Sequence, residues 1–173
     1  NTFAPSYIVV RKDSGIKTLE DLRGKKIAFV SHLASSGYVV PRAFLMSQGI
    51  DVDREMTVVF TKNLPGTLLA VLNREVDVAG MCGVNYADLS RRIDTEGVEI
   101  FRTTEVSPRL PLVVRKGLDR GVVAKIKAAA IGLKTDPEAG PTLKALSFDG
   151  FDPITDAEYD GIRKLARQTG LPH

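Results

Sequence analysis

Small polar residues between an apolar segment and a helix-like segment form the part of this sequence best suited to chemistry. The β-prone run 27–30 is followed by the polar loop 31–37, and a helical pattern extends over 38–48. Unpaired N–H groups at a helix start carry partial positive charge from the helix dipole and can hold an anion. The order strand, small-residue loop and helix therefore predicts an anion-binding site.

Five residues of this segment are candidates for direct contact with the anion. Ser35 and Ser36 offer hydroxyl donors, and Gly37 allows a ligand to approach the backbone closely. His32 could donate to an oxyanion, and Tyr38 could donate its hydroxyl or stack on a ligand. Each residue also has a structural alternative: ordinary helix capping for the serines, a surface-loop position for His32, and packing for Tyr38.

Two further candidates follow other predicted strands. Asn63 precedes a second helix start, and Cys82 follows the predicted strand 76–81. Ligands of open α/β sheets bind beside the carboxyl ends of the strands, which would place both residues near the first loop. The alternatives are routine helix capping for Asn63 and core packing for Cys82.

Catalytic and metal-binding patterns are missing from the sequence. His32 and His173 are the only histidines, and neither lies in a persuasive Ser–His–acid arrangement. No His, Cys, Asp and Glu cluster has metal-ligand spacing, and neither a GxGxxG nor a Walker A pattern occurs. We therefore expect a protein that is not an enzyme and that needs no metal or cofactor.

Composition and charge argue against two classes of binding partner, nucleic acids and the membrane interior. Of the 173 residues, 43% are hydrophobic and 26% are charged, which is typical of a globular chain with a sizeable core. The 24 Lys and Arg residues are scattered and the net charge is only +3, so we expect no nucleic-acid interface. No apolar run approaches the length needed to span a bilayer, so we expect no membrane insertion of this segment.

The hydrophobic pattern alternates between strands and helices up to residue 102. We expect strands at 7–11, 26–30, 56–61, 76–81 and 98–102. We expect helices at 38–48, at 68–74 after a loop at 63–67 that leads into it, and at 86–92. This alternation predicts an α/β fold with a parallel, doubly wound sheet. After a polar, irregular segment at 103–109, the pattern predicts a strand at 110–115 and helices at 119–133, 136–146 and 155–168.

Several runs resemble the phosphonate-type periplasmic solute-binding proteins of ABC importers: DSGIKTLEDLRGKKIAFV, SSGYVVPRAFL, LLAVLNREVDVAG, SPRLPLVVRKGL and FDGFDPITDAEYDGIR. The resemblance covers nearly the whole chain. It implies the type II periplasmic-binding-protein fold, in which two lobes of parallel-rich sheet are flanked by helices. Residues 17–102 would form a complete α/β lobe. Residues 1–16 and 103–173 would supply the hinge strands and the C-terminal part of the other lobe, which would be incomplete because its N-terminal part is missing.

The resemblance implies a binding protein that captures a small phosphorus oxyanion, such as a phosphonate, phosphite or phosphate-like anion, between two lobes. Its partner would be a membrane-embedded ABC permease, and its location periplasmic or otherwise extracytoplasmic, with an upstream lipid anchor left open. One alternative is the ligand-sensing domain of a signalling receptor with the same clamp fold, whose partner would be a sensor protein. A less favoured alternative is a two-lobed enzyme that resembles a pyrimidine-precursor synthase.

The same resemblance bears on the size of the ligand. The family's anion loop corresponds to 34–38, where Ser35 and Ser36 keep the hydroxyl pattern and Ala34 loses it. Acidic residues that hold the amine of an aminophosphonate would fall near Val84 and Leu110, which are apolar here. We therefore expect a compact oxyanion in preference to an aminoalkylphosphonate.

Overall fold

The computed structural model describes residues 2–170, which form two compact units. The larger unit contains Phe3–Ser107 together with the C-terminal helix from Tyr159, and the smaller unit contains Pro108–Glu158. The boundary between these units differs from the expected lobe division, because the first strand belongs with the segment 17–102; the lobe assignment stays a prediction.

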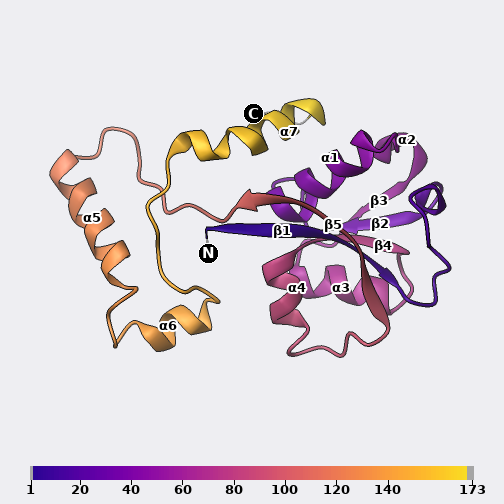
Figure 1. Cartoon of the computed structure of the whole chain (residues 1–173), viewed down its shortest axis with the longest axis horizontal. Coiled ribbons are helices and arrows are strands. Elements are labelled where there is room, and N and C mark those ends of the chain that lie inside the picture. Colours follow the sequence, from indigo (N-terminus) through magenta and orange to yellow (C-terminus); the bar gives the residue numbers. More distant parts are fainter. Residues whose placement is uncertain (1, 171–173) are drawn as a thin grey trace. The chain divides into compact units, whose positions relative to one another are not determined.

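A five-stranded sheet with the order β3-β2-β4-β1-β5 forms the centre of the larger unit (Figure 1). Its strands are β1 (Phe3–Arg11), β2 (Lys26–Phe29), β3 (Thr57–Phe60), β4 (Val78–Cys82) and β5 (Val98–Pro108). β2 pairs in parallel with β3 and β4, whereas β1 pairs antiparallel with β4. The predicted α/β fold with a parallel-rich sheet is confirmed.

The direction of β1 departs from the fully parallel sheet that the alternation predicted. A helical crossover fixes strand direction, and such crossovers connect β2 to β3 and β3 to β4. β1 is instead connected to β2 by a turn and the single 3₁₀ turn η1 (Glu20–Leu22). The pattern of helices therefore carried no information on how β1 would pair.

Helices cover both faces of this sheet. The π-helical turn η2 (Ser35–Val39) continues directly into α1 (Val40–Ser47) on one face, and α3 (Leu64–Leu72) lies on the other (Figure 1). The remaining helices of the larger unit are α2 (Val52–Glu55), α4 (Gly83–Leu89) and α7 (Asp160–Gln168). α7 packs against α1 and η2.

The two predictions made for 103–109 and 110–115 are wrong. Strand β5 continues to Pro108 through the segment expected to be irregular, because β1 supplies a backbone partner along this length. Residues 110–115, expected to form a strand, have no regular structure, and Leu110 is 84% exposed. Strand propensity was therefore overridden at both places by the availability of a neighbouring strand.

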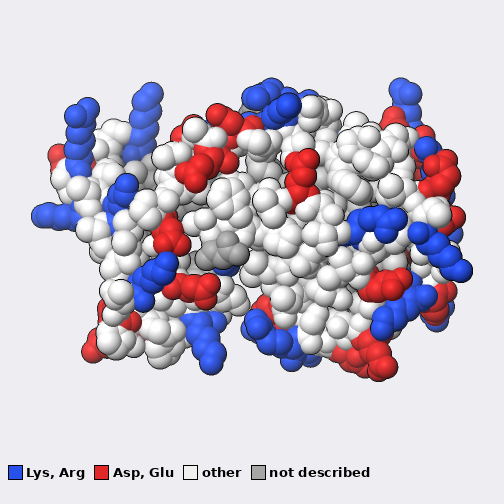
Figure 2. All heavy atoms as spheres, in the orientation of Figure 1, with Lys and Arg blue, Asp and Glu red and all other residues white. Residues whose placement is uncertain are grey.

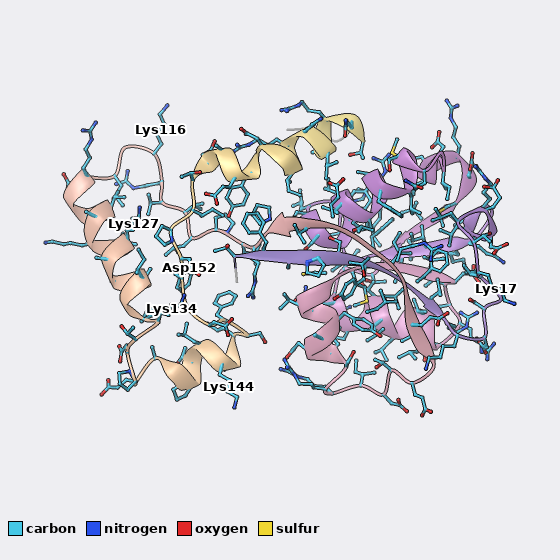
Figure 3. The ribbon with its side chains drawn as sticks, in the orientation of Figure 1. Lys17, Lys116, Lys127, Lys134, Lys144 and Asp152 are labelled. Atoms are coloured by element: carbon cyan, nitrogen blue, oxygen red, sulfur yellow. The ribbon has the colours of Figure 1, made fainter. Side chains whose placement is uncertain are left out.

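The smaller unit contains α5 (Arg120–Gly132), α6 (Gly140–Ala145) and the 3₁₀ turn η3 (Asp156–Tyr159), which leads into α7. α5 has no buried residue, and Leu143 of α6 is buried. Lys134 donates to Asp152 at 2.9 Å, which joins the segment after α5 to the segment after α6 (Figure 3). Partly exposed ion pairs of this kind add little stability.

Gly80 of β4 allows the helix to pack closely on the sheet. A Cβ atom at this position would lie 2.5 Å from Cε1 of Phe29 and 3.0 Å from Cγ of Pro41. Phe29 belongs to the neighbouring strand β2 and is fully buried, so its ring cannot move into solvent. The space that a side chain would occupy is therefore already filled.

We expect Gly80→Ala to lower the free energy of unfolding by about 1–3 kcal/mol, because overpacking forces the neighbours of the new methyl group to shift. Denaturant unfolding followed by circular dichroism measures this change. Gly161→Ala is the matched control, because nothing lies within 4 Å of the position that a Cβ atom would occupy there in α7. An equal loss of stability in both variants would contradict the packing argument.

Arg42 of α1 is a buried cation that joins three elements. Its side chain is 6% exposed, donates to the backbone carbonyl of Thr169 after α7, and pairs with Asp53 of α2. The guanidinium carbon also lies 5.9 Å from the centre of the Tyr38 ring. Arg42 therefore ties the C-terminal segment and α2 to the helix that begins at the predicted anion loop.

Arg42→Met should lower the free energy of unfolding by about 1–3 kcal/mol, because it leaves the buried carbonyl of Thr169 without its donor. Arg54→Met is the control, since Arg54 is 86% exposed and its pair with Asp51, at 3.6 Å, contributes little. Thermal unfolding of both variants distinguishes them. An Arg42 variant as stable as the Arg54 variant would show that the buried guanidinium is dispensable.

Candidate anion-binding site

Two loops meet at the carboxyl edge of the parallel strands. Backbone N–H groups after β3 donate to carbonyls at the end of β2, from Thr61 to Phe29 and from Lys62 to Val30, both at 3.0 Å. The loop after β3 is thereby held against the loop that leads into η2. The structure thus confirms that the first two predicted loops are neighbours, as the rule for open α/β sheets requires.

The helix after β2 begins three residues earlier than predicted, and it begins as a π-turn. Ala34 is the residue before the helix, with an extended backbone and no side-chain capping bond. The N–H of Val39 donates to the carbonyl of Ala34 at 3.1 Å. Because this first bond spans five residues, the amides of 35–38 all precede the first donor of the helix. A run of four such amides is a suitable site for an anion.

Ser35 and Ser36 lie within this run. Both are half-buried, and neither hydroxyl has a hydrogen-bond partner among residues 2–170. The capping alternative placed them before the helix, but the structure places them in its first turn. Gly37 is buried, and a Cβ atom there would lie 3.3 Å from Cγ1 of Val30, so the loop packs tightly at this point.

An aromatic cluster of His32, Tyr38 and Phe60 lies beside the helix start. The His32 ring stacks on Phe60 with 3.7 Å between the ring centres, and the edge of Tyr38 meets both rings. These contacts hold the exposed His32 next to the amides of η2. The sequence reasoning singled out His32 and Tyr38 and missed Phe60, whose place at the end of a predicted strand beside the loop was the available signal.

Tyr38 is itself mostly buried, with 5% of its surface exposed. Burial raises the pKa of its phenol above the ordinary value, since the charged form would lose its hydration. The side chain therefore stays neutral at physiological pH and adds no negative charge beside the helix start. This placement fits the packing alternative for Tyr38.

Asn63 uses its side chain to cap α3. Its Oδ1 accepts from the N–H of Gly66 at 2.6 Å, and its Nδ2 donates to the carbonyl of Thr61 at 3.2 Å. Both ends of the amide are therefore engaged locally, which matches the capping alternative. Its neighbour Lys62, which the sequence reasoning missed, lies in the left-handed region with φ 65° and brings an exposed positive charge to this loop.

Cys82 lies half-buried at the end of β4, where it precedes α4. In the antiparallel pairing of β1 with β4 it is directly opposite Ser6. Cys82 therefore lies at the same edge of the sheet as the loop 31–37, as the sequence predicted. By the alternation of the strand its side chain shares a face with Val78 and Gly80, and Gly80 lies against Phe29 and Pro41 on the side of α1.

Metal sites, membrane-spanning helices and clusters of one charge would each point to another kind of function. Within residues 2–170 there is no group of three or more His, Cys, Asp and Glu residues arranged to hold a metal ion. No described helix is long and apolar enough to cross a membrane. On the face shown in Figure 2, basic and acidic residues are interspersed.

Comparison with known proteins gives concordant results. The family model for "ABC transporter, phosphonate, periplasmic substrate-binding protein" matches residues 1–159. The phosphate-import protein PhnD of Mycolicibacterium smegmatis is 26% identical over 188 residues, which cover 95% of this chain and 58% of that protein. The structure of PhnD1 from Prochlorococcus marinus in complex with methylphosphonate has a TM-score of 0.86 at 18% identity, covering 98% of this chain and 68% of that chain.

A different class of protein also shares part of the sequence. The tetrathionate sensor histidine kinase TtrS of Salmonella typhimurium is 32% identical over 93 residues, which are 54% of this chain and 15% of the kinase. The chain spans about half the length of the curated relatives that it matches: 58% of PhnD and 49% of the phosphonates-binding periplasmic protein of Escherichia coli. Because the family model covers most of the sequence, the chain belongs to the phosphonate-type periplasmic substrate-binding proteins of ABC transporters.

Proposed function

We propose that this chain is the solute-binding part of an ABC importer and that it captures a small phosphorus oxyanion at the start of η2. The observation that carries the proposal is the run of four amides at 35–38, which the π-turn places ahead of the first helical hydrogen bond. Such amides bind anions without any charged side chain. The chain acts extracytoplasmically, delivers the anion to a membrane-embedded permease and catalyses no reaction.

The hydroxyls of Ser35 and Ser36 complete this set of donors. They belong to the same turn as the amides and have no protein partner among the described residues. Hydrogen bonds to a charged group are stronger than those between neutral groups, and each contributes about 1.5–3 kcal/mol. His32, held by Phe60, offers a further donor at the rim of the loop.

The chemistry of two other positions favours a compact anion. The family resemblance places acidic residues that hold a ligand amine near Val84 and Leu110, and neither side chain here carries a charge. An ammonium group would lose part of its hydration on binding without gaining a charged partner. Phosphate, phosphite and methylphosphonate therefore fit better than an aminoalkylphosphonate.

A sensory role is the second candidate, and the partial similarity to the tetrathionate sensor kinase favours it. In that case the same loop recognises the anion, and the partner is a signalling protein in place of a permease. Reconstitution decides between the two roles: stimulation of permease ATPase activity by the liganded chain supports import, and stimulation of an associated kinase supports sensing.

The anion site is tested by combining Ser35→Ala with Ser36→Ala. Loss of two charge-assisted donors should weaken the binding of phosphate, phosphite or methylphosphonate at least about tenfold. Amide chemical shifts of 35–38, followed by NMR during titration with each anion, give both the location and the affinity. Ser47→Ala is the control, because its hydroxyl donates to the carbonyl of Phe44 at the far end of α1. Equal anion affinities of the double variant and the Ser47→Ala control would contradict an anion site at the helix start.

Selectivity is tested by thermal shift at equal anion concentrations. Methylphosphonate or phosphite should raise the melting temperature more than 2-aminoethylphosphonate, because at equal concentration the ligand with the higher affinity stabilises the folded state more. Sodium chloride at matched ionic strength is the control for general salt effects. The reverse ranking would show that the apolar residues at positions 84 and 110 do not disfavour an amine.

A further inference from the structure

Ser6 of β1 carries a buried hydroxyl that the protein leaves unpaired. The residue is fully buried, and its Oγ has no hydrogen-bond partner among the described residues. The backbone carbonyl of Ser6, in contrast, accepts from Oγ1 of Thr104 in β5 at 3.1 Å. Burying a hydroxyl without a partner is unfavourable, so an orphan of this kind calls for a specific explanation such as a ligand.

The register of the sheet shows which face Ser6 occupies. Successive side chains of a strand alternate between faces, so Ser6 shares a face with Ile8 and Val10. Ile8 and Val10 pack in the same core cluster as Phe29 and Tyr38, which lies beneath η2 and α1. Ser6 therefore points to the side of the sheet that carries the anion-binding turn.

Ser6 also lies at the edge of the sheet where the parallel strands have their carboxyl ends. β1 runs antiparallel to β4, and Ser6 is paired with Cys82 at the carboxyl end of β4. η2 contacts both β1 and β4. In a parallel βαβ unit the helix runs back across the sheet, so its first residues lie nearest the carboxyl edge. The Ser6 hydroxyl and the amides of 35–38 therefore converge on the same end of the sheet.

We propose that Ser6 is a further specificity-determining residue of the anion site, and that its hydroxyl hydrogen-bonds to an oxygen of a phosphate, phosphite or phosphonate bound at the start of η2. This inference rests on the proposed function. A hydroxyl can donate to a deprotonated oxygen and can accept from an acidic O–H, so it is suited to anions that still carry a proton. The hydroxyl is buried before binding, so little further desolvation opposes the contact.

Ser107 provides a matched control inside the same unit. It is also buried, at 1% exposed, and its Oγ also lacks a partner among residues 2–170. It lies in the edge strand β5, which β1 separates from β4. η2 contacts β1 and β4. Ser107 therefore shares the burial of Ser6 but lies one strand farther from β4.

The test compares Ser6→Ala and Ser107→Ala in the full chain. Both variants should melt at or slightly above the wild-type temperature, since each removes an unpaired buried hydroxyl. Titration with phosphate and with methylphosphonate, followed at the amides of 35–38 by NMR, should show about tenfold weaker binding for Ser6→Ala and wild-type binding for Ser107→Ala. If Ser6→Ala does not fold, Ser6→Cys keeps the shape with a weaker donor and should also bind more weakly.

Two results would overturn the inference, and they are distinguishable. If the wild-type chain binds either anion at these amides and the Ser6 variants bind equally well, Ser6 has no part in the site and the proposed function stands. If the wild-type amides respond to neither phosphate nor methylphosphonate, the proposed function fails and the role of Ser6 fails with it. Equal weakening by the Ser6 and Ser107 variants would assign the effect to general packing and would also overturn the inference.

Discussion

The close packing of η2 and α1 on β4 is the constraint on which the arrangement of the site depends. Gly80 leaves room for the Phe29 ring and for Pro41 of α1, so the helix approaches the sheet closely at this point. Phe29 in turn contacts Tyr38 and Phe60, which lie beside the loop 31–37. One missing side chain in the sheet thus sets the depth at which the helix start lies.

The elements of the larger unit hold this helix from several sides. Below it, η2 contacts β1 and β4, and at its outer side α7 packs on both η2 and α1. Arg42 adds a polar connection to Thr169 and Asp53. A turn whose amides are unpaired gains nothing from its own hydrogen bonds, so its conformation has to be fixed by its surroundings. The packing here provides that support without occupying the amides.

The sequence was sufficient to predict the α/β class, the central strands and the loop that follows β2, because alternation of apolar strands and amphipathic helices is a local signal. It could not show that the helix after β2 starts at Ser35. Serine and glycine are weak helix formers, and a π-turn has no periodicity of its own in the pattern. The extension of β5 and the direction of β1 were also missed, since both depend on which strand lies alongside and not on local propensity.

The residues proposed for the site also differ in whether a local sequence signal could identify them. The loop that contains Ser35 and Ser36 was found from the order of elements, which the sequence records directly. Ser6, which we propose as a further contact, was not singled out, because a serine inside a strand carries no signal until the register shows which face it occupies. Asn63 was proposed as a ligand contact, and the structure shows both ends of its amide engaged in capping. Local capping chemistry and ligand binding use the same residue types, so type alone could not separate them.

The kind of group that attracts the anion at the proposed site determines which anions the site can distinguish. Within the loop 31–38 there is no Lys or Arg, so at the proposed site the attraction for an anion would come from oriented amides and hydroxyls, with Lys62 exposed on the neighbouring loop. A surface cation attracts any anion and is screened by salt, whereas fixed donors favour ligands whose oxygens match their directions. An anion with several oxygens around one small centre can satisfy several fixed donors simultaneously, whereas a single carboxylate offers only two oxygens in one plane. The helix start is therefore better suited to select by the geometry of the oxyanion than by its charge alone.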